Sequence, residues 1–147
     1  MHFFLGLAAI FLCTLGSCTY SKVVEVVPIN DSLVVMKAKT NNVSYIAMHG
    51  YRIQNYYGLS FHATTNNNRE IVININNFNG RMGMYHIGDI SIDSCSAYYT
   101  ENGITHNSLY GDVNIIEASP YYLGVFNFTC SDSFKVDSGY FRINPYQ

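Results

Sequence analysis

Residues 58–76, GLSFHATTNNNREIVININ, contain two runs in which apolar and polar residues alternate, with three consecutive asparagines between them. Alternation with a period of two is typical of a β-strand that buries one face. The apolar residues that would share this face are Leu59, Phe61, Ala63, Ile71, Ile73 and Ile75. Because Asn66-Asn67-Asn68 is a turn sequence, the stretch predicts an antiparallel hairpin.

Short runs of β type occupy most of the remaining chain, and turn residues separate them. These runs are 33–39, 43–47, 82–87, 95–100, 109–116, 121–129 and 134–143. Strands about ten residues apart, with no sustained helical period, indicate an all-β antiparallel protein. We expect an antiparallel β-sandwich, with a small open β-barrel as the alternative, in a single domain over 32–147. The stretch 49–58 is interpreted as irregular.

The composition favours an exported β protein. Charged residues make up 12% of the chain, about half the usual share, so amides and hydroxyls supply most of the polarity. The formal net charge is −2, and the lysines and arginines are scattered singly. No basic field that would attract a nucleic acid results from this distribution. We therefore expect no nucleic-acid partner.

The N-terminus reads as a signal peptide. Residues 3–12 form an unbroken apolar run, which is too short to span a bilayer as a helix. The tetrapeptide Leu15-Gly16-Ser17-Cys18 that follows it resembles the bacterial lipobox. This resemblance implies a lipoprotein signal peptide over 1–17, a lipidated Cys18, and a tether over 18–31. Dual acylation of such a cysteine gives stable membrane anchoring.

An ordinary signal peptidase offers the alternative route. Cleavage after Gly16, with Thr14 at the third position before the cut, would suit that enzyme and would give a secreted protein. Thr19 stands where an aspartate would retain a lipoprotein in the inner membrane. By that resemblance we expect an outer-membrane lipoprotein of the bacterial cell envelope, facing either the periplasm or the cell surface.

A wider resemblance covers most of residues 33–143. Its short motifs are Met36-Lys37-Ala38-Lys39, Val43-Ser44-Tyr45-Ile46-Ala47, the glycine-bounded segment 83–88, and the pair 123–128 and 136–141. In this order, after a lipobox, they are similar to small β-sandwich lipoproteins of Bacteroidota. The resemblance implies a β-sandwich and a lipid anchor. It implies no activity, because that group has no settled one.

Two cysteines remain once the signal peptide is removed and Cys18 is acylated. In the strand assignment, Cys95 begins one strand and Cys130 follows the third strand of a meander. They would lie near opposite ends and two strands apart, whereas a disulfide needs Cα atoms within about 7 Å. Buried free thiols are therefore favoured over a disulfide, although an oxidising compartment permits one.

No pattern for catalysis or metal binding stands out. The histidines His49, His62, His86 and His106 lack the spacing of metal ligands. Most acidic residues lie beside turn residues, where they cap or solvate, although a carboxylate pair of the glycosidase type remains a less favoured alternative. We expect no catalytic residue, no metal and no cofactor.

Tyrosines are the most suggestive surface feature, since exposed tyrosines stack on sugars or peptides at low entropic cost. The candidate binding residues are Tyr51, Tyr56, Tyr57, Tyr99 and Tyr122. The alternative is that tyrosine simply fits a half-buried β face. We expect a membrane-anchored, non-enzymatic protein with a ligand-binding or structural accessory role. Its expected partners are the membrane, through the lipid anchor, and a glycan, a peptide or an envelope protein. A secreted carbohydrate- or peptide-binding module is the alternative.

Overall fold

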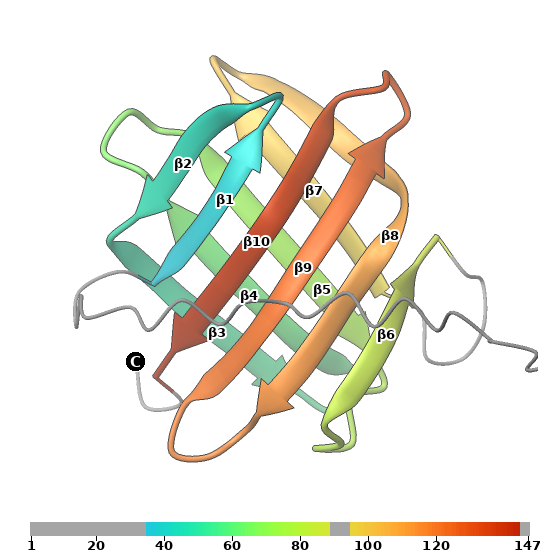
Figure 1. Cartoon of the computed structure of the whole chain (residues 1–147). Coiled ribbons are helices and arrows are strands. Elements are labelled where there is room, and N and C mark those ends of the chain that lie inside the picture. Colours follow the sequence, from blue (N-terminus) through green and yellow to red (C-terminus); the bar gives the residue numbers. More distant parts are fainter. Residues whose placement is uncertain (1–34, 89–94, 145–147) are drawn as a thin grey trace, which may run out of the picture.

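A computed structural model describes residues 35–88 and 95–144, which contain ten β-strands (Figure 1). The strands are β1 Met36–Thr40, β2 Val43–Ala47, β3 His49–Asn55, β4 Gly58–Thr64, β5 Glu70–Asn76, β6 Gly83–Ile87, β7 Cys95–Glu101, β8 Ile104–Glu117, β9 Tyr122–Cys130 and β10 Lys135–Ile143. The expected signal peptide (1–17), the tether (18–31) and Cys18 lie outside the described residues. No helix among the described residues is long and apolar enough to cross a membrane.

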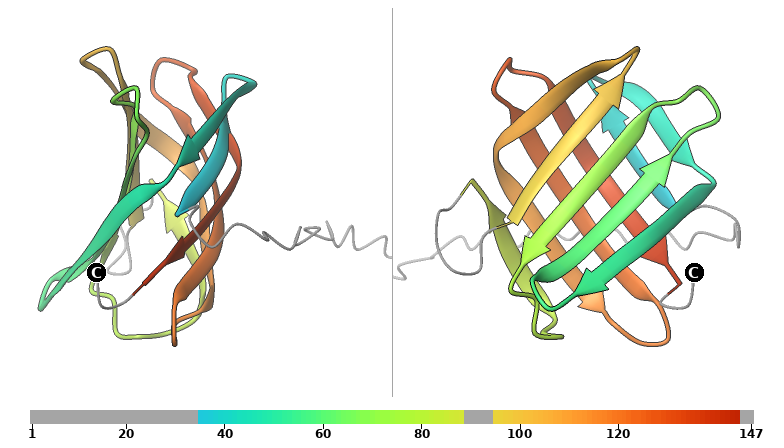
Figure 2. Two further views of the ribbon diagram at one scale, coloured as in Figure 1. Left: turned by 90° about the vertical axis from the view of Figure 1, so that its left-hand side faces the viewer. Right: turned by 180° about the vertical axis from the view of Figure 1, so that it is seen from behind.

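All ten strands belong to one sheet, in the order β2-β1-β10-β9-β8-β6-β7-β5-β4-β3. The pairing is antiparallel except between β6 and β7, which share one parallel pair, Ile87 with Cys95. The sheet folds over so that β1, β10, β9 and β8 face β7, β5, β4 and β3 (Figure 2). The predicted all-β antiparallel class is confirmed. Because both layers are parts of one nearly closed sheet, the open barrel describes them better than two separate sheets do.

Strand β8 connects the two layers. Its first residues, from Ile104 to Asn107, pair with β7, whereas Gly111 to Ile115 pair with β6. A bulge between Ser108 and Tyr110 separates the two portions. Bulges bend a strand and increase its local twist, which lets one long strand take part in both layers.

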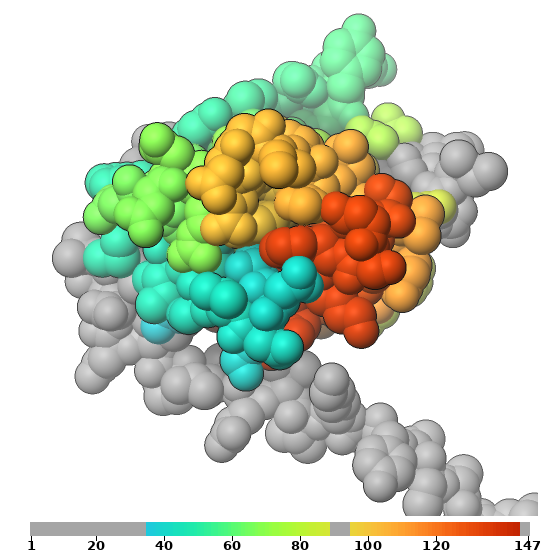
Figure 3. Space-filling view, turned by 90° about the horizontal axis from the view of Figure 1, so that it is seen from above, coloured from blue at the N-terminus to red at the C-terminus, as the bar shows by residue number. Residues whose placement is uncertain are grey.

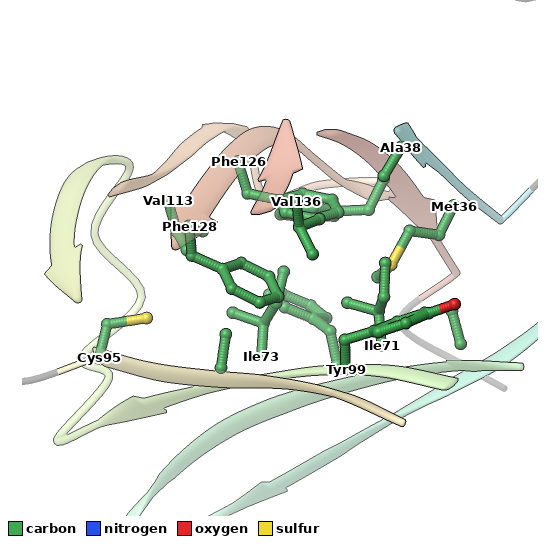
Figure 4. Close-up of a cluster of buried hydrophobic side chains, with 14 of the residues drawn as sticks. Met36, Ala38, Ile71, Ile73, Cys95, Tyr99, Val113, Phe126, Phe128 and Val136 are labelled. Carbon is green, nitrogen blue, oxygen red and sulfur yellow. The ribbon is translucent and has the colours of Figure 1, made fainter. Parts of the chain in front are cut away.

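The predicted hairpin is β4–β5, and the six apolar residues expected to share one face do so. Leu59 pairs with Ile75, Phe61 with Ile73 and Ala63 with Ile71, and all six side chains are buried. Side chains from the two layers point toward one another in the core (Figure 4). Burial of this shared apolar face is the main favourable term in folding.

Two glycines of β9 and β10 lie beneath phenylalanine rings. Gly124 pairs with Phe141, and Gly139 pairs with Phe126 on the neighbouring strand. A Cβ atom on Gly124 would lie 2.5 Å from Cζ of Phe141, and one on Gly139 would lie 2.6 Å from the Phe126 ring. Each ring therefore occupies the space that a side chain on its cross-strand partner would need.

Polar contacts of Tyr45 and Arg69 draw the β2 end of the sheet toward β4 and β5. The buried Tyr45 hydroxyl donates to the carbonyl oxygen of Ala63 and accepts from the amide of Ile71 at 3.2 Å. The Arg69 guanidinium donates to the carbonyl oxygen of Ser44 at 3.1 Å. These contacts bring the terminal strand β2 close to the opposite layer, so the barrel is nearly closed here.

Two strand assignments differ from the expectation. Residues 49–55, which were interpreted as irregular, form β3, and β8 begins at Ile104 rather than at residue 109. Strand β3 is the last strand of the sheet, and side chains on both of its faces are exposed or half-buried. It therefore lacks the one-sided apolar pattern by which strands are recognised.

Candidate functional site

Three of the five candidate tyrosines are exposed. Tyr56 and Tyr57 form the tip of the β3–β4 hairpin, where they are 95% and 76% exposed and meet edge to face at 5.7 Å. The Asn55 carboxamide oxygen accepts hydrogen bonds from the amides of Tyr57 and Gly58 and orders the turn. The tip projects from the body of the protein (Figure 3). Tyr51 lies on the outer face of β3 and is 48% exposed.

The other two candidates are corrected by the structure, since Tyr99 and Tyr122 are buried. Tyr99 stacks on Phe134 in the core at 4.9 Å, and Tyr122 lies 5.4 Å from the ring of Phe61. Burial removes both from any exposed binding surface. In each tyrosine pair the preceding residue, Tyr98 or Tyr121, is the more exposed member.

A row of side chains in register crosses the outer face of the β3, β4, β5 and β7 layer. Tyr51 pairs with His62, His62 with Val72, and Val72 with Tyr98. These four strands lie side by side in the right-hand view of Figure 2. We call this row and the two rows beside it the tyrosine face.

The rows beside the central row are mostly polar. One consists of Ile53, Ser60, Asn74 and Ser96, and the other of His49, Thr64, Glu70 and Thr100. Within the first, the Ser60 hydroxyl donates to the side-chain oxygen of Asn74 at 2.6 Å. The tyrosine face thus presents aromatic rings between hydroxyl and amide groups.

Ring packing supports the centre of the tyrosine face. The Tyr51 ring stacks on the imidazole of His62 with centroids 4.6 Å apart and planes within 7°. Val72, although it is on the outer side of the barrel, is only 1% exposed between its neighbours His62 and Tyr98. The side chains around Val72 therefore cover it almost completely.

Glu70 is the acidic member of the tyrosine face. One of its carboxylate oxygens lies 3.5 Å from Nδ1 of His62. Desolvation raises the pKa of Tyr98, and the negative charge of Glu70 and the nearby Tyr51 add to this effect. The Tyr98 hydroxyl, which is protonated at neutral pH as in any tyrosine, is thus even less readily ionised and can donate a hydrogen bond.

Two histidine–aspartate pairs also occur, and no spacing in the sequence anticipates either of them. Nδ1 of His86 lies 2.6 Å from the carboxylate of Asp112, at directly paired positions of β6 and β8. Nδ1 of His106 bonds to the carboxylate of Asp132. Mainly through this hydrogen bond, the pKa of Asp132 is held below its usual range.

Cys130 is a possible nucleophile that lies near the second pair. Its thiol is buried and donates to the main-chain oxygen of His106 at 3.4 Å. Burial, with Asp132 nearby, raises the pKa of this thiol to about 11. The thiolate is the reactive form of cysteine, and a thiol with so high a pKa is almost entirely protonated at neutral pH. The arrangement therefore does not activate Cys130.

The second thiol is also in the core. Cys95 and Cys130 are both free and buried, in agreement with the expected free thiols, and burial raises the pKa of Cys95 to about 12. Within residues 35–88 and 95–144, no group of three or more His, Cys, Asp or Glu side chains is arranged to hold a metal ion.

Comparison of the chain with protein-family models, with curated proteins and with solved structures finds no match.

Proposed function

We propose that this chain is a lipid-anchored, non-enzymatic protein of the bacterial cell envelope whose β domain acts as a binding module. The observation that carries the binding role is the tyrosine face, where Tyr51, His62 and Tyr98 form an aromatic row between hydroxyl and amide groups. Tyrosine provides large, rigid contact area together with a hydroxyl donor, a combination that favours ligand recognition.

The lipid anchor is supported by the chain before the described domain. The apolar run 3–12 is followed by Leu15-Gly16-Ser17-Cys18. Leu15 suits the lipobox and would be too large for an ordinary peptidase that cut directly before Cys18. Residues 19–34 separate Cys18 from the first described residue. Fully extended, they would reach on the order of 50 Å, which is enough to display the domain away from a membrane. Thr19 favours the outer membrane.

The chemistry of the described residues supports a non-enzymatic role. The two thiols are buried with raised pKa values. The two His–Asp pairs, at 86/112 and 106/132, each include one residue of β8. Asp112 and His106 are six positions apart on that strand, which corresponds to about 20 Å, so the pairs do not meet at one position. General acid–base catalysis depends on such groups converging on one substrate position.

Anchoring is tested by fractionation of cells that express the full-length chain, followed by intact-mass spectrometry of the membrane fraction. We expect a mature N-terminus at Cys18 that carries the mass of a diacylglyceryl and an amide-linked acyl group. The Cys18→Ser variant should lose these groups. The Cys13→Ser variant is the matched control and should keep them, because Cys13 leaves with the signal peptide.

A mature N-terminus at Ser17 or Thr19 without lipid would refute the anchor and favour the secreted alternative. Binding by the tyrosine face is a separate property, and its test follows.

A further inference from the structure

We propose that the tyrosine face binds a neutral oligosaccharide that lies across strands β3, β4, β5 and β7. This inference rests on the proposed binding role but not on the lipid anchor. Tyr51 and Tyr98 stack on the apolar faces of the sugar rings, and the side chains of Ser60, Asn74 and Glu70 bond to hydroxyl groups. His62 is a positioning residue that holds the Tyr51 ring.

The location of the residues on a sheet face favours a sugar over a peptide. Peptides are recognised by sheets mainly at edges, where main-chain groups are free to form a further ladder. Strands β4, β5 and β7 each have a paired neighbour on both sides, so their main-chain groups are engaged in the sheet. Over these three strands the tyrosine face therefore offers a ligand only side chains, which include an aromatic ring, hydroxyls, an amide and the Glu70 carboxylate. Strand β3 is the last strand of the sheet and pairs on one side, and it contributes Tyr51 through its ring.

The distribution of charge favours a neutral ligand. Strands β4, β5 and β7 contain no lysine or arginine. Arg52 of β3 occupies a position that pairs with the inward-facing Phe61, and its guanidinium lies over the ring of Tyr122 at 5.4 Å. A carboxylate or phosphate on the ligand would find no lysine or arginine in the three rows of the face and would meet the carboxylate of Glu70.

The spacing of the two tyrosines favours an oligosaccharide over a single sugar. Tyr51 and Tyr98 lie three strands apart in one row, which corresponds to about 14 Å between their main chains. This span is longer than a single sugar ring, so a monosaccharide would cover only part of the row. A chain of several sugar units that crosses the strands can place one unit on each tyrosine and direct its hydroxyl groups to the polar row beside them.

The Tyr51–His62 stack shapes the first of these contacts. One face of the Tyr51 ring packs on the imidazole at 4.6 Å, yet Tyr51 remains 48% exposed. The opposite ring face is thus held in a fixed orientation before ligand arrives. Such preorganisation reduces the entropy lost on binding.

The test uses the purified full-length protein on an array of neutral and acidic oligosaccharides, from disaccharides to hexasaccharides, followed by calorimetric titration of the best neutral ligand. We expect binding that strengthens with chain length and no binding of acidic chains. Tyr51→Ala and Tyr98→Ala should each weaken binding about tenfold, a loss of the size found when an important contact residue is truncated. Tyr51→Phe, which keeps the ring, should retain most of the affinity.

Tyr140→Ala is the matched control. Tyr140 lies on the outer side of β10, in the opposite layer, where it pairs with Lys37 and Val125. This variant should bind like the unchanged protein, and circular dichroism should report a folded β domain for every variant.

The proposal is overturned if the folded protein binds no neutral oligosaccharide. It is also overturned if the protein prefers an acidic oligosaccharide, or a peptide on a parallel array. Equal affinity of Tyr51→Ala and Tyr140→Ala for the oligosaccharide would overturn it as well. An unlipidated protein that still binds sugar would refute the anchor alone. A lipidated protein that binds no sugar would refute this inference alone.

Discussion

Replacing Gly124 by alanine should destabilise the barrel through a defined steric conflict. The added Cβ would lie 2.5 Å from Cζ of Phe141 and 2.5 Å from the main-chain oxygen of Asn114. Ordinary contact between carbon atoms begins near 3.5 Å, so the ring would have to retreat by about 1 Å. The ring is fully buried, and its centroid lies 4.6 Å from that of Phe61 and 6.3 Å from that of Phe126, so a retreat would disturb its packing with these rings.

Overpacking of this kind typically lowers the free energy of unfolding by about 1–3 kcal/mol. We expect Gly124→Ala to lower it by about 2 kcal/mol in urea titrations followed by far-ultraviolet circular dichroism, with tyrosine fluorescence as the second probe because the chain contains no Trp. The double variant with Phe141→Leu should recover part of the loss, since the smaller side chain vacates the space. Recovery is partial because the contact with Asn114 persists.

The control is Gly103→Ala. Gly103 has a φ of +77°, and a Cβ added to it would meet no atom of the described residues within 4 Å, so its substitution strains the main chain without touching Phe141. Gly103→Ala should lower the free energy of unfolding by about 1 kcal/mol. Combined with Phe141→Leu, the two losses should simply add. The steric conflict is refuted if Gly124→Ala stays within about 0.5 kcal/mol of the unchanged protein, or if it is also additive with Phe141→Leu.

Three further predictions follow from buried or paired polar groups. Tyr45→Phe should lower the free energy of unfolding by about 1 kcal/mol in urea titrations, because the hydroxyl that bonds to both β4 and β5 is lost; an unchanged value would contradict this role. Burial raises the pKa of Cys95 to about 12, so the folded state retains a proton that the unfolded chain releases above about pH 8.5. The free energy of unfolding should therefore fall as the pH rises from about 9 toward 12, and it should fall less steeply in Cys95→Ala. If the unchanged protein and Cys95→Ala lose stability equally with pH, the raised pKa of Cys95 is refuted. The pKa of Asp132 is held below its usual range by the hydrogen bond with His106. Its ionised carboxylate therefore stabilises the folded state above about pH 4, and this stabilisation is lost as the pH falls through the pKa that Asp132 has in the folded protein. Asp132→Asn should accordingly make thermal melts less sensitive to acid below about pH 4, and unchanged acid sensitivity would contradict this.

Much of the fold could be predicted from the sequence wherever one face of a strand is buried. The hairpin of 58–76 is assigned to the correct strands and turn because its apolar residues alternate with polar ones at every position except Val72. Strand β3 could not be found in this way, since side chains on both of its faces are exposed. Whether the strands form two sheets or one barrel depends on how β8 divides its pairing between β7 and β6, and no local pattern encodes that choice.

The candidate site was predicted only in part, for a similar reason. Adjacent tyrosines must point to opposite faces, but a pair alone does not say which one is buried. The neighbouring residues do carry that signal. Cys95 and Ala97 alternate with Ser96, which assigns Tyr99 to the inside and Tyr98 to the outside. The position of His62 on the outer face could be anticipated, because it alternates with the apolar residues of β4. Its stacking on Tyr51 could not, because it depends on the register of β3, which was interpreted as irregular.

The position of β1 between β2 and β10 has a consequence for the order of assembly. The first described strand obtains one of its two neighbours only when the last strand has been synthesised, so its pairing joins residues about as far apart in the chain as the domain allows. Contacts of such high sequence separation form slowly, because loop closure must precede them. A chain truncated after Cys130 should therefore show no cooperative thermal transition by circular dichroism. During synthesis, β1 therefore gains its second neighbour only after residues 135–143 have been made, whereas β4 can pair with β5 as soon as both are present.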